Sequence, residues 1–389
     1  METAYLDNNA TAPVLPEVLE AMRPYLGERF GNPSSSYWRG REARAAMETA
    51  RERVARLLGA RAHEVVFTSG GSEGDTAALL GLVTRGDHVI TSAVEHHAVL
   101  NSCRFLERTG VEVTYLPVDR AGRVDPAAVR AALRPSTRLV SVILASNETG
   151  VLQPIEEIGR IAAEADVWFH TDAVQAAGKV PVDVARIRCD LLTLSGHKLH
   201  APLGSGALYV RSGTFLRPLV QGGPQEHGFR AGTENLPAIV GLGVAAELAA
   251  AWLAGPSPAA MASERDRLER TVLEQVPGAR VNGAGAPRIP NTTSLVLPGV
   301  AGKSVVAALD LEGIAASTGS ACSTGSSEPP HVLVAMGLPL EEAYATVRFS
   351  LGKQTRPAEV DQLLRCLPPV VARLREVSPV WSRRAAVPR

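Results

Sequence analysis

The chain has 389 residues, a length that exceeds one compact core and favours a large domain with a smaller one. Its apolar share of 45% and charged share of 21% are those of an ordinary globular protein. The 40 Lys and Arg residues balance the 40 Asp and Glu residues. No net charge therefore favours direct binding to nucleic acid or to an anionic membrane.

Two further features concern the compartment. The N-terminus lacks the basic segment and apolar run of a secretory signal, and no long run of uncharged apolar residues predicts a transmembrane helix. The four cysteines, Cys103, Cys189, Cys322 and Cys366, lie far apart and form neither a zinc spacing nor a disulfide framework. We therefore expect a cytoplasmic protein with reduced thiols.

Strand and helix signals alternate along the first two thirds of the chain. An amphipathic helix is predicted over residues 39–60, where apolar side chains recur at helical spacing. Strands are predicted at residues 64–68, 88–91, 112–118, 138–145, 167–172 and 190–195, and helices at 126–133 and 155–165. This order predicts an α/β fold with a mostly parallel sheet that is covered by helices on both faces.

A composition shift near residues 249–260, where AAAWLAGPSPAA ends in Gly, Pro and Ser, marks a predicted domain boundary. We assign residues 15–255 to a large domain, and residues 1–14 together with 256–389 to a small one. The second part has an α+β pattern, with helices near residues 263–275, at 303–313 and from 358, and strands at 293–297 and 346–351.

The strongest local signal is LSGHKLHAPLGSGALYV at residues 194–210. Lys198 follows a predicted strand that leads the chain inward, and it stands in a turn rich in Ser, Gly and His. A lysine whose pKa is lowered in such a place can form a Schiff base with a carbonyl cofactor. The alternative is a solvated surface lysine.

A pyridoxal cofactor also needs a carboxylate against its pyridine nitrogen and backbone N–H groups for its phosphate. Asp172 ends a predicted strand 26 residues before Lys198 (198 − 172), and Gln175 follows it. The segment FTSGGSEGD gives a strand, a glycine turn with Ser72, and a helix start. The alternatives are a helix N-cap at Asp172 and an ordinary strand-to-helix turn at the glycines.

His96 and His97 follow another predicted strand, in VEHHAVL. A histidine there could stack on the pyridine face and move protons near neutral pH. The pair could also bind a metal, but no carboxylate or cysteine stands at ligand spacing in the sequence. We therefore expect no metal site.

Cys322 lies in STGSACSTGSSEPPHVL, a run rich in small residues. A thiol in such a loop can be exposed and react as a thiolate, whereas the other three cysteines stand in apolar segments typical of structural thiols. A surface cysteine without a role is the alternative. Arg348, in the predicted strand TVRFSL, needs an anionic partner, which is either a substrate carboxylate or a structural ion pair.

The ordered set of motifs resembles the cysteine desulfurase family, in the class V aminotransferase group of fold-type I pyridoxal enzymes. The resemblance runs nearly end to end and includes YLDNNATAPV, EVVFTSGGSE, TSAVEHHAVL, VSVILASNETGVLQPI, HTDAVQAAGK, LSGHK, RAGTEN, STGSACS and VRFSLG in family order. The SACS, EP and HVL elements are similar to the longer-loop NifS/IscS branch. The resemblance implies a seven-stranded type of sheet in the large domain.

The same resemblance implies that pyridoxal 5'-phosphate is the cofactor and that Lys198 binds it covalently. Asp172 then pairs with the pyridine nitrogen, and His96 stacks on the ring and takes part in proton transfer. Gln175 and Asn147 flank the ring oxygen and the substrate.

The residues that match phosphate contacts are Gly71, Ser72, Ser195, His197 and, across a homodimer, Thr233. Arg348 matches the clamp on the substrate carboxylate, and Asn9 matches a second substrate contact. Cys322 matches the cysteine that receives the sulfur.

The sequence departs from the family pattern at several positions. Ser72 stands where threonine is usual, but it keeps a hydroxyl group for the phosphate. Thr76 replaces an asparagine, and Leu203 replaces a lysine after the cofactor lysine. Further departures lie in loops, at Gln221, Pro224 and Pro330. We expect these departures to leave the chemistry intact. They bear on the choice of partner and on the turnover rate.

The resemblance implies an enzyme that takes sulfur from L-cysteine, giving L-alanine and a persulfide on Cys322. The persulfide would pass to a protein acceptor such as an iron–sulfur scaffold or a thiolation enzyme. One alternative is a selenocysteine lyase or another β-eliminating C–S lyase, which needs no acceptor thiol. The other is a non-catalytic sulfur-carrier scaffold, which need not keep Lys198, Asp172 and Cys322 together.

Overall fold

A seven-stranded sheet forms the centre of the computed structural model, which describes residues 3–318, 330–379 and 381. Its order is β2-β8-β7-β6-β5-β3-β4. The strands are β2 (Val65–Thr68), β3 (His88–Ser92), β4 (Glu112–Leu116), β5 (Thr137–Ser141), β6 (Trp168–Asp172), β7 (Leu191–Ser195) and β8 (Gly206–Val210). The pairs from β4 to β7 are parallel, and β8 is antiparallel to β7 and β2. The predicted mostly parallel sheet is confirmed.

Successive side chains along each strand point to opposite faces of this sheet. Apolar side chains point to both faces, and both faces are therefore buried. Val65 and Phe67 point to one apolar cluster, whereas Val66 points to the other. The first cluster includes α2 (Trp38–Leu58), α5 (Pro126–Ala132), α6 (Ile155–Glu164), α7 (Val184–Ile187) and α8 (Leu236–Ala254). The second includes α3 (Gly71–Leu82) and α4 (His97–Arg108). Helices thus cover both faces, as predicted.

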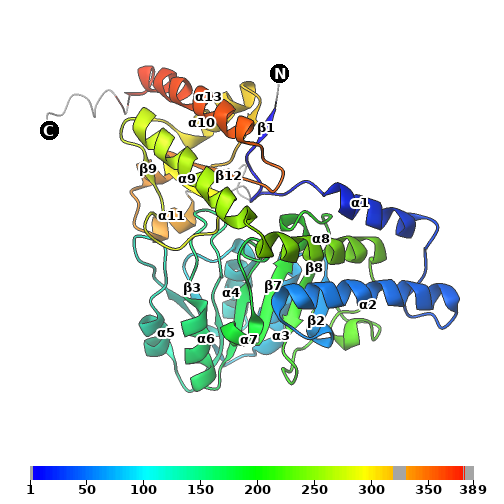
Figure 1. Cartoon of the computed structure of the whole chain (residues 1–389). Coiled ribbons are helices and arrows are strands. Elements are labelled where there is room, and N and C mark those ends of the chain that lie inside the picture. The colour runs from blue at the N-terminus through cyan, green and yellow to red at the C-terminus, as the bar shows by residue number, and fades with distance from the viewer. Residues whose placement is uncertain (1–2, 319–329, 380, 382–389) are drawn as a thin grey trace.

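Helix α8 is long and apolar enough to cross a membrane by length and composition alone, and it is the one such helix among the described residues. This property was not expected from the sequence. Most of the helix is buried, and it lies along α2 and next to α1 (Pro16–Met22) (Figure 1). Its apolar surface is that of a helix packed on several sides.

The C-terminal part has its own apolar cluster and a three-stranded antiparallel sheet, β12-β10-β9. These strands are β9 (Arg280–Val281), β10 (Thr292–Val296) and β12 (Thr346–Ser350). The helices of this part are α9 (Ser257–Gln275), α10 (Gly302–Leu311), α11 (His331–Ala335), α12 (Leu340–Tyr344) and α13 (Pro357–Glu376). Single 3-10 turns, found throughout the chain, are η1 (Arg23–Leu26), η2 (Ala62–Glu64), η3 (Gly196–Lys198) and η4 (Glu226–Gly228).

The N-terminus packs with this C-terminal part, because β1 (Ala4–Tyr5) pairs with β11 (Ile314–Ala315) and contacts α13 (Figure 1). The separate apolar cluster and this pairing support the division into residues 15–255 and residues 1–14 with 256–389. The exact division stays a prediction. Helices α8 and α9 are separated by only Gly255 and Pro256.

A buried ion pair ties α2 to the segment before α8. Arg51 donates from both terminal nitrogens to the carboxylate of Glu226, at 2.7 and 2.8 Å, and each side chain is 1% exposed. Glu226 also accepts from the backbone N–H of Phe67 in β2 at 2.6 Å. The pair therefore fixes the segment around Glu226 to the strand that leads into the glycine turn.

We expect Arg51→Ala to lower the free energy of unfolding by about 3–5 kcal/mol, because it leaves the Glu226 carboxylate buried without its partner. Arg53→Ala, on the same helix, removes a more exposed pair with Glu247 and should cost at most about 1 kcal/mol. Equilibrium urea denaturation measures both variants. Equal losses in the two would contradict a special role for the buried pair.

Candidate active site

A cavity of about 340 Å³ lies where the carboxyl ends of the central strands meet the N-terminal and C-terminal segments. Among the predicted site residues that the structure describes, all except Thr233 line it. The lining members of that set are Asn9, Gly71, Ser72, His96, Asn147, Asp172, Gln175, Ser195, His197, Lys198 and Arg348. Segments far apart in the sequence thus build one site.

Lys198 stands in η3, directly after β7, so the buried strand places its side chain at the cavity. Its Nζ donates to the backbone carbonyls of Asn9 at 2.5 Å and Ala10 at 2.6 Å. The amine is partly buried and held by neutral acceptors. The predicted inward-pointing lysine is therefore present, and the alternative of a solvated surface lysine does not hold.

Asp172 ends β6 and is 3% exposed. Burial raises its pKa to about 6, although the N–H of Val174, at 2.8 Å, and nearby Lys198 oppose this shift. The Val174 contact lies in a turn and is not the helix N-cap weighed as an alternative, because no helix starts directly after β6. Asp172 also lines the cavity. Its carboxyl group is ionised at neutral pH.

Asp75 of α3 is a fully buried neighbour that was not predicted. Burial and the nearby Asp172 carboxylate raise its pKa well above the ordinary value. Two buried carboxyl groups so close do not both ionise readily. Asp75 therefore keeps its proton, and Asp172 carries the negative charge.

His96 caps the N-terminus of α4, where its Nδ1 accepts from the N–H of Ala98 at 3.2 Å. Burial, then the neighbouring His97 and Lys198, lowers its pKa to about 4. The ring is therefore neutral near pH 7, and its proton is on Nε2 because Nδ1 accepts. A flat neutral ring at the cavity wall suits stacking on an aromatic cofactor.

Asp75, His96 and Asp172 each offer one ligand atom, and these atoms lie within 4.8 Å of one another. Ligand spacing in the sequence could not show this cluster, because the three residues come from α3, the start of α4 and β6. A protonated Asp75 is a weak metal ligand. An ionised Asp172 close to the neutral ring of His96 instead suits a ligand whose aromatic ring has a protonated nitrogen.

An anion cradle lies at the start of α3. Gly71 and Ser72 form the first turn of this helix, whose unpaired N–H groups attract phosphate. A Cβ at position 206 would come within 2.6 Å of the Cα of Gly70. Only a glycine at position 206 therefore lets strand β8 approach the turn this closely. Ser195 and His197 line the same cavity.

The substrate end contains Arg348 of β12, which is 1% exposed. Its Nη2 contacts Asp7 Oδ1 at 2.6 Å, and its Nη1 donates to the Asn147 carbonyl at 2.9 Å. The structural ion pair weighed from the sequence is therefore present, while the guanidinium also lines the cavity. A fixed guanidinium can bind a carboxylate with little further ordering.

Asn9 lines the cavity, but both ends of its amide bind protein. Its Nδ2 donates to the Asn147 carbonyl at 3.1 Å and to Thr292 Oγ1 at 2.9 Å, and its Oδ1 accepts from Asn291 at 3.1 Å. This arrangement favours a positioning role. The substrate contact of Asn9 stays a prediction.

Cys322 lies outside the described residues. The described residues that flank it in sequence lie at the site: Ser317 pairs through its backbone with Arg348, and His331 lines the cavity. Thr233 is exposed and does not line the cavity of its own chain.

Two other polar lining groups, Glu148 and His331, escaped the sequence prediction. Glu148 directly follows Asn147 and is fully buried, which raises its pKa to about 7. His331 Nδ1 lies 4.0 Å from Glu148 Oε1, and its ring lies 4.6 Å from that of His97. One signal for Glu148 was present in the sequence, because it directly follows Asn147 in the motif VSVILASNETGVLQPI. No sequence signal marked the contacts of His331, which join segments far apart in the chain.

Two of the other cysteines are structural, as predicted. Cys103 and Cys189 are fully buried among apolar side chains. Burial raises the pKa of each thiol far above its ordinary value, so neither forms a thiolate readily. Cys366 is half-buried against the C-terminal apolar cluster.

Comparison with known proteins gives matches along the whole chain. The Aminotransferase class-V family model matches residues 4–363. A protein named cysteine desulfurase IscS from Dictyoglomus turgidum is 47% identical over 379 residues, covering 96% of either chain. A solved NifS-like protein superimposes with a TM-score of 0.89 at 35% identity, covering 96% of this chain and 100% of that one. The structure of SspA in complex with cysteine superimposes with a TM-score of 0.80 at 39% identity, covering 90% of this chain and 99% of that one. The chain belongs to the cysteine desulfurase family of class-V aminotransferases.

Proposed function

We propose that this protein is a pyridoxal 5'-phosphate-dependent cysteine desulfurase. It would remove sulfur from L-cysteine and leave L-alanine and a persulfide on Cys322. The observation that carries this proposal is the convergence of Lys198, Asp172, His96 and Arg348 on one cavity. The named cysteine complex of a similar structure supports the choice of substrate.

The residues present fit this cofactor. Lys198 would bind it covalently, Asp172 would stabilise a protonated ring nitrogen, and His96 would cover one ring face. Gly71, Ser72, Ser195 and His197 would hold the phosphate, and Gln175 would face the ring oxygen. When bound, pyridoxal 5'-phosphate withdraws electrons from the carbons of an amino-acid substrate.

The polar groups at the substrate end orient cysteine. Arg348, fixed by Asp7, would bind the carboxylate in a bidentate manner, and Asn147, whose backbone carbonyl accepts from Arg348, lines the same cavity. The amine of Lys198, when free, would accept or donate a proton at the substrate carbons. The carbonyls of Asn9 and Ala10 offer that amine a resting position.

The sulfur step needs a thiolate. Cys322 Sγ would attack the substrate sulfur, so that an S–S bond forms and the substrate C–S bond breaks. The carbon keeps the electron pair and receives a proton, which gives alanine after release. Cys103 and Cys189 are buried with raised thiol pKa values, so neither is a suitable acceptor.

We also propose that the protein is a cytoplasmic homodimer that passes its sulfur to a protein acceptor, such as an iron–sulfur scaffold or a thiolation enzyme. Four large apolar side chains are more than half exposed within one short segment, at Leu26, Phe30, Tyr37 and Trp38. A second copy of the chain would cover such a surface. Exposed Thr233 would then complete the phosphate site of the partner.

Borohydride reduction of the cofactor-loaded protein should fix the cofactor to one peptide, and that peptide should contain Lys198. Lys179 is the natural internal control, because it lies nearby but donates to Gln175 at 2.6 Å. Peptide mapping by mass spectrometry identifies the modified lysine. A label on Lys179 would refute the assignment of the cofactor lysine.

Cys322→Ala should still bind the cofactor and still change its absorption spectrum with L-cysteine, because the cavity residues are untouched. Its alanine production should fall by at least about a hundredfold, since the sulfur has no nucleophile to receive it. Cys103→Ala and Cys366→Ala are the matched controls, with turnover close to that of the unmodified enzyme. Near-normal turnover in Cys322→Ala would overturn the sulfur acceptor.

Sedimentation should give a dimer, and Thr233→Ala should weaken cofactor binding. A mixed dimer of Thr233→Ala and Lys198→Ala chains would then keep one site with both residues intact, because each site takes Thr233 from its partner. Recovery of about half the activity of an unmodified dimer is expected from this complementation, because one of its two sites is intact. A fully active, cofactor-loaded monomer would contradict the shared site.

A further inference from the structure

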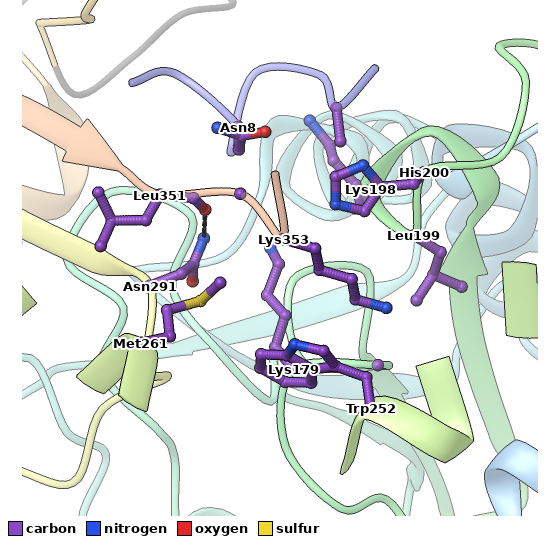
Figure 2. Close-up of a pocket in the computed structure, with 13 residues that line it drawn as sticks. Asn8, Lys179, Lys198, Leu199, His200, Trp252, Met261, Asn291, Leu351 and Lys353 are labelled. Atoms are coloured by element: carbon purple, nitrogen blue, oxygen red, sulfur yellow. Dashed lines mark hydrogen bonds between the residues drawn. The ribbon is translucent and has the colours of Figure 1, made fainter. Parts of the chain in front are cut away.

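A second, smaller cavity of about 20 Å³ shares Lys198 with the reaction cavity. Figure 2 shows Lys179 and Lys353 reaching this space beside Trp252. Lys198 and His200 also line it. No Asp or Glu occurs among the described residues that form its wall.

Lys353, in the loop after β12, brings a cation to this wall. Its Nζ is buried and has no hydrogen-bond partner among the described residues, and it lies 5.4 Å from the centre of the Trp252 ring. Burial lowers its pKa to about 8, so it is still largely charged at neutral pH. A buried ammonium group without an anionic partner is costly.

Lys179 also lines this cavity. It is 9% exposed, and its Nζ donates to Gln175 Oε1 at 2.6 Å and to Asn9 Oδ1 at 3.4 Å. Both acceptors are neutral. Burial, and then repulsion by Lys198 and other nearby cations, lowers its pKa well below the ordinary value.

The remaining polar wall brings no negative charge. His200 Nδ1 lies 2.8 Å from the Pro13 carbonyl, and burial lowers the pKa of this ring to about 4, so it is neutral. Asn291 uses its Nδ2 to donate to Asn9 and to the Leu351 carbonyl. Lys353 therefore brings a buried positive charge to the cavity and Lys179 brings a second amine, while no described residue of the wall brings a negative charge.

We propose that this cavity binds one small monovalent inorganic anion, of the chloride type, between Lys179 and Lys353. A volume of about 20 Å³ has room for a single water-sized occupant, which excludes phosphate and organic acids. An anion supplies the missing negative charge, which a water molecule cannot do. It would fix Lys179 and, through Lys179, the amide of Gln175 at the reaction cavity. This site does not depend on the proposed activity.

Bromide, which replaces chloride and scatters anomalously, is the probe. Crystals of the cofactor-loaded protein soaked in bromide should show an anomalous peak between Lys179 and Lys353. In solution, the bromide affinity of Lys353→Met should fall by at least about tenfold, because one of the binding charges is lost. Lys303→Met, which removes an exposed lysine on α10, should bind bromide normally.

A pH series keeps the proposal testable if Lys353→Met fails to fold. Lys179, Lys198 and His200 face the same space, but Lys353 is the group with a pKa near 8. Bromide affinity of the unmodified protein should therefore fall between about pH 7 and about pH 9.5, since deprotonation removes the charge. No anomalous peak, an affinity independent of pH, or equal binding by the two variants would overturn the anion site.

Discussion

The site depends on the contacts that the N-terminal segment at residues 7–10 makes. The side chain of Asp7 holds Arg348, and the carbonyl of Asn9 accepts from both Lys198 and Gln175. The segment enters the site from β1, which belongs to the C-terminal part of the fold. One short stretch therefore orients Lys198, the proposed cofactor lysine, and Arg348, the proposed substrate arginine, although these come from different parts of the chain.

Burial determines how charge is distributed around the cavity. His96 and His197 are neutral because burial lowers the pKa of each to about 4. Asp75 keeps its proton, which leaves Asp172 as the carboxylate at the base of the cavity. In a medium of low dielectric constant, these fixed charges act strongly on whatever binds between them. The arrangement favours a ligand with a protonated ring and an anionic tail.

Much of the fold could be predicted from local pattern. The strands are continuous apolar runs because both faces of the sheet are buried, and predicted helix 39–60 corresponds to α2 (Trp38–Leu58) with ends shifted by one or two residues. Helix α8 was not predicted, because its apolar residues surround the whole helix and show no clear periodicity. The site residues were reached through the ordered motifs, each of which has an ordinary structural alternative when taken alone.

Contacts between distant segments could not be predicted. Asp75 beside Asp172, Lys179 beside Gln175 and Arg51 with Glu226 depend on how the elements pack, since no spacing in the sequence marks them. Arg348 shows the limit in another way. Its ion pair with Asp7 and its position at the cavity were weighed as rivals, and the structure contains both.

The central claim is that sulfur passes from L-cysteine to Cys322 through chemistry prepared by Lys198. Mass spectrometry of the intact peptides after brief exposure to L-cysteine tests it most directly, with Lys198→Ala as the control. The account predicts one additional sulfur atom on the Cys322 peptide of the unmodified protein and none in Lys198→Ala. Additional sulfur on the Cys103, Cys189 or Cys366 peptide instead, or equal labelling of Cys322 in Lys198→Ala, would contradict it.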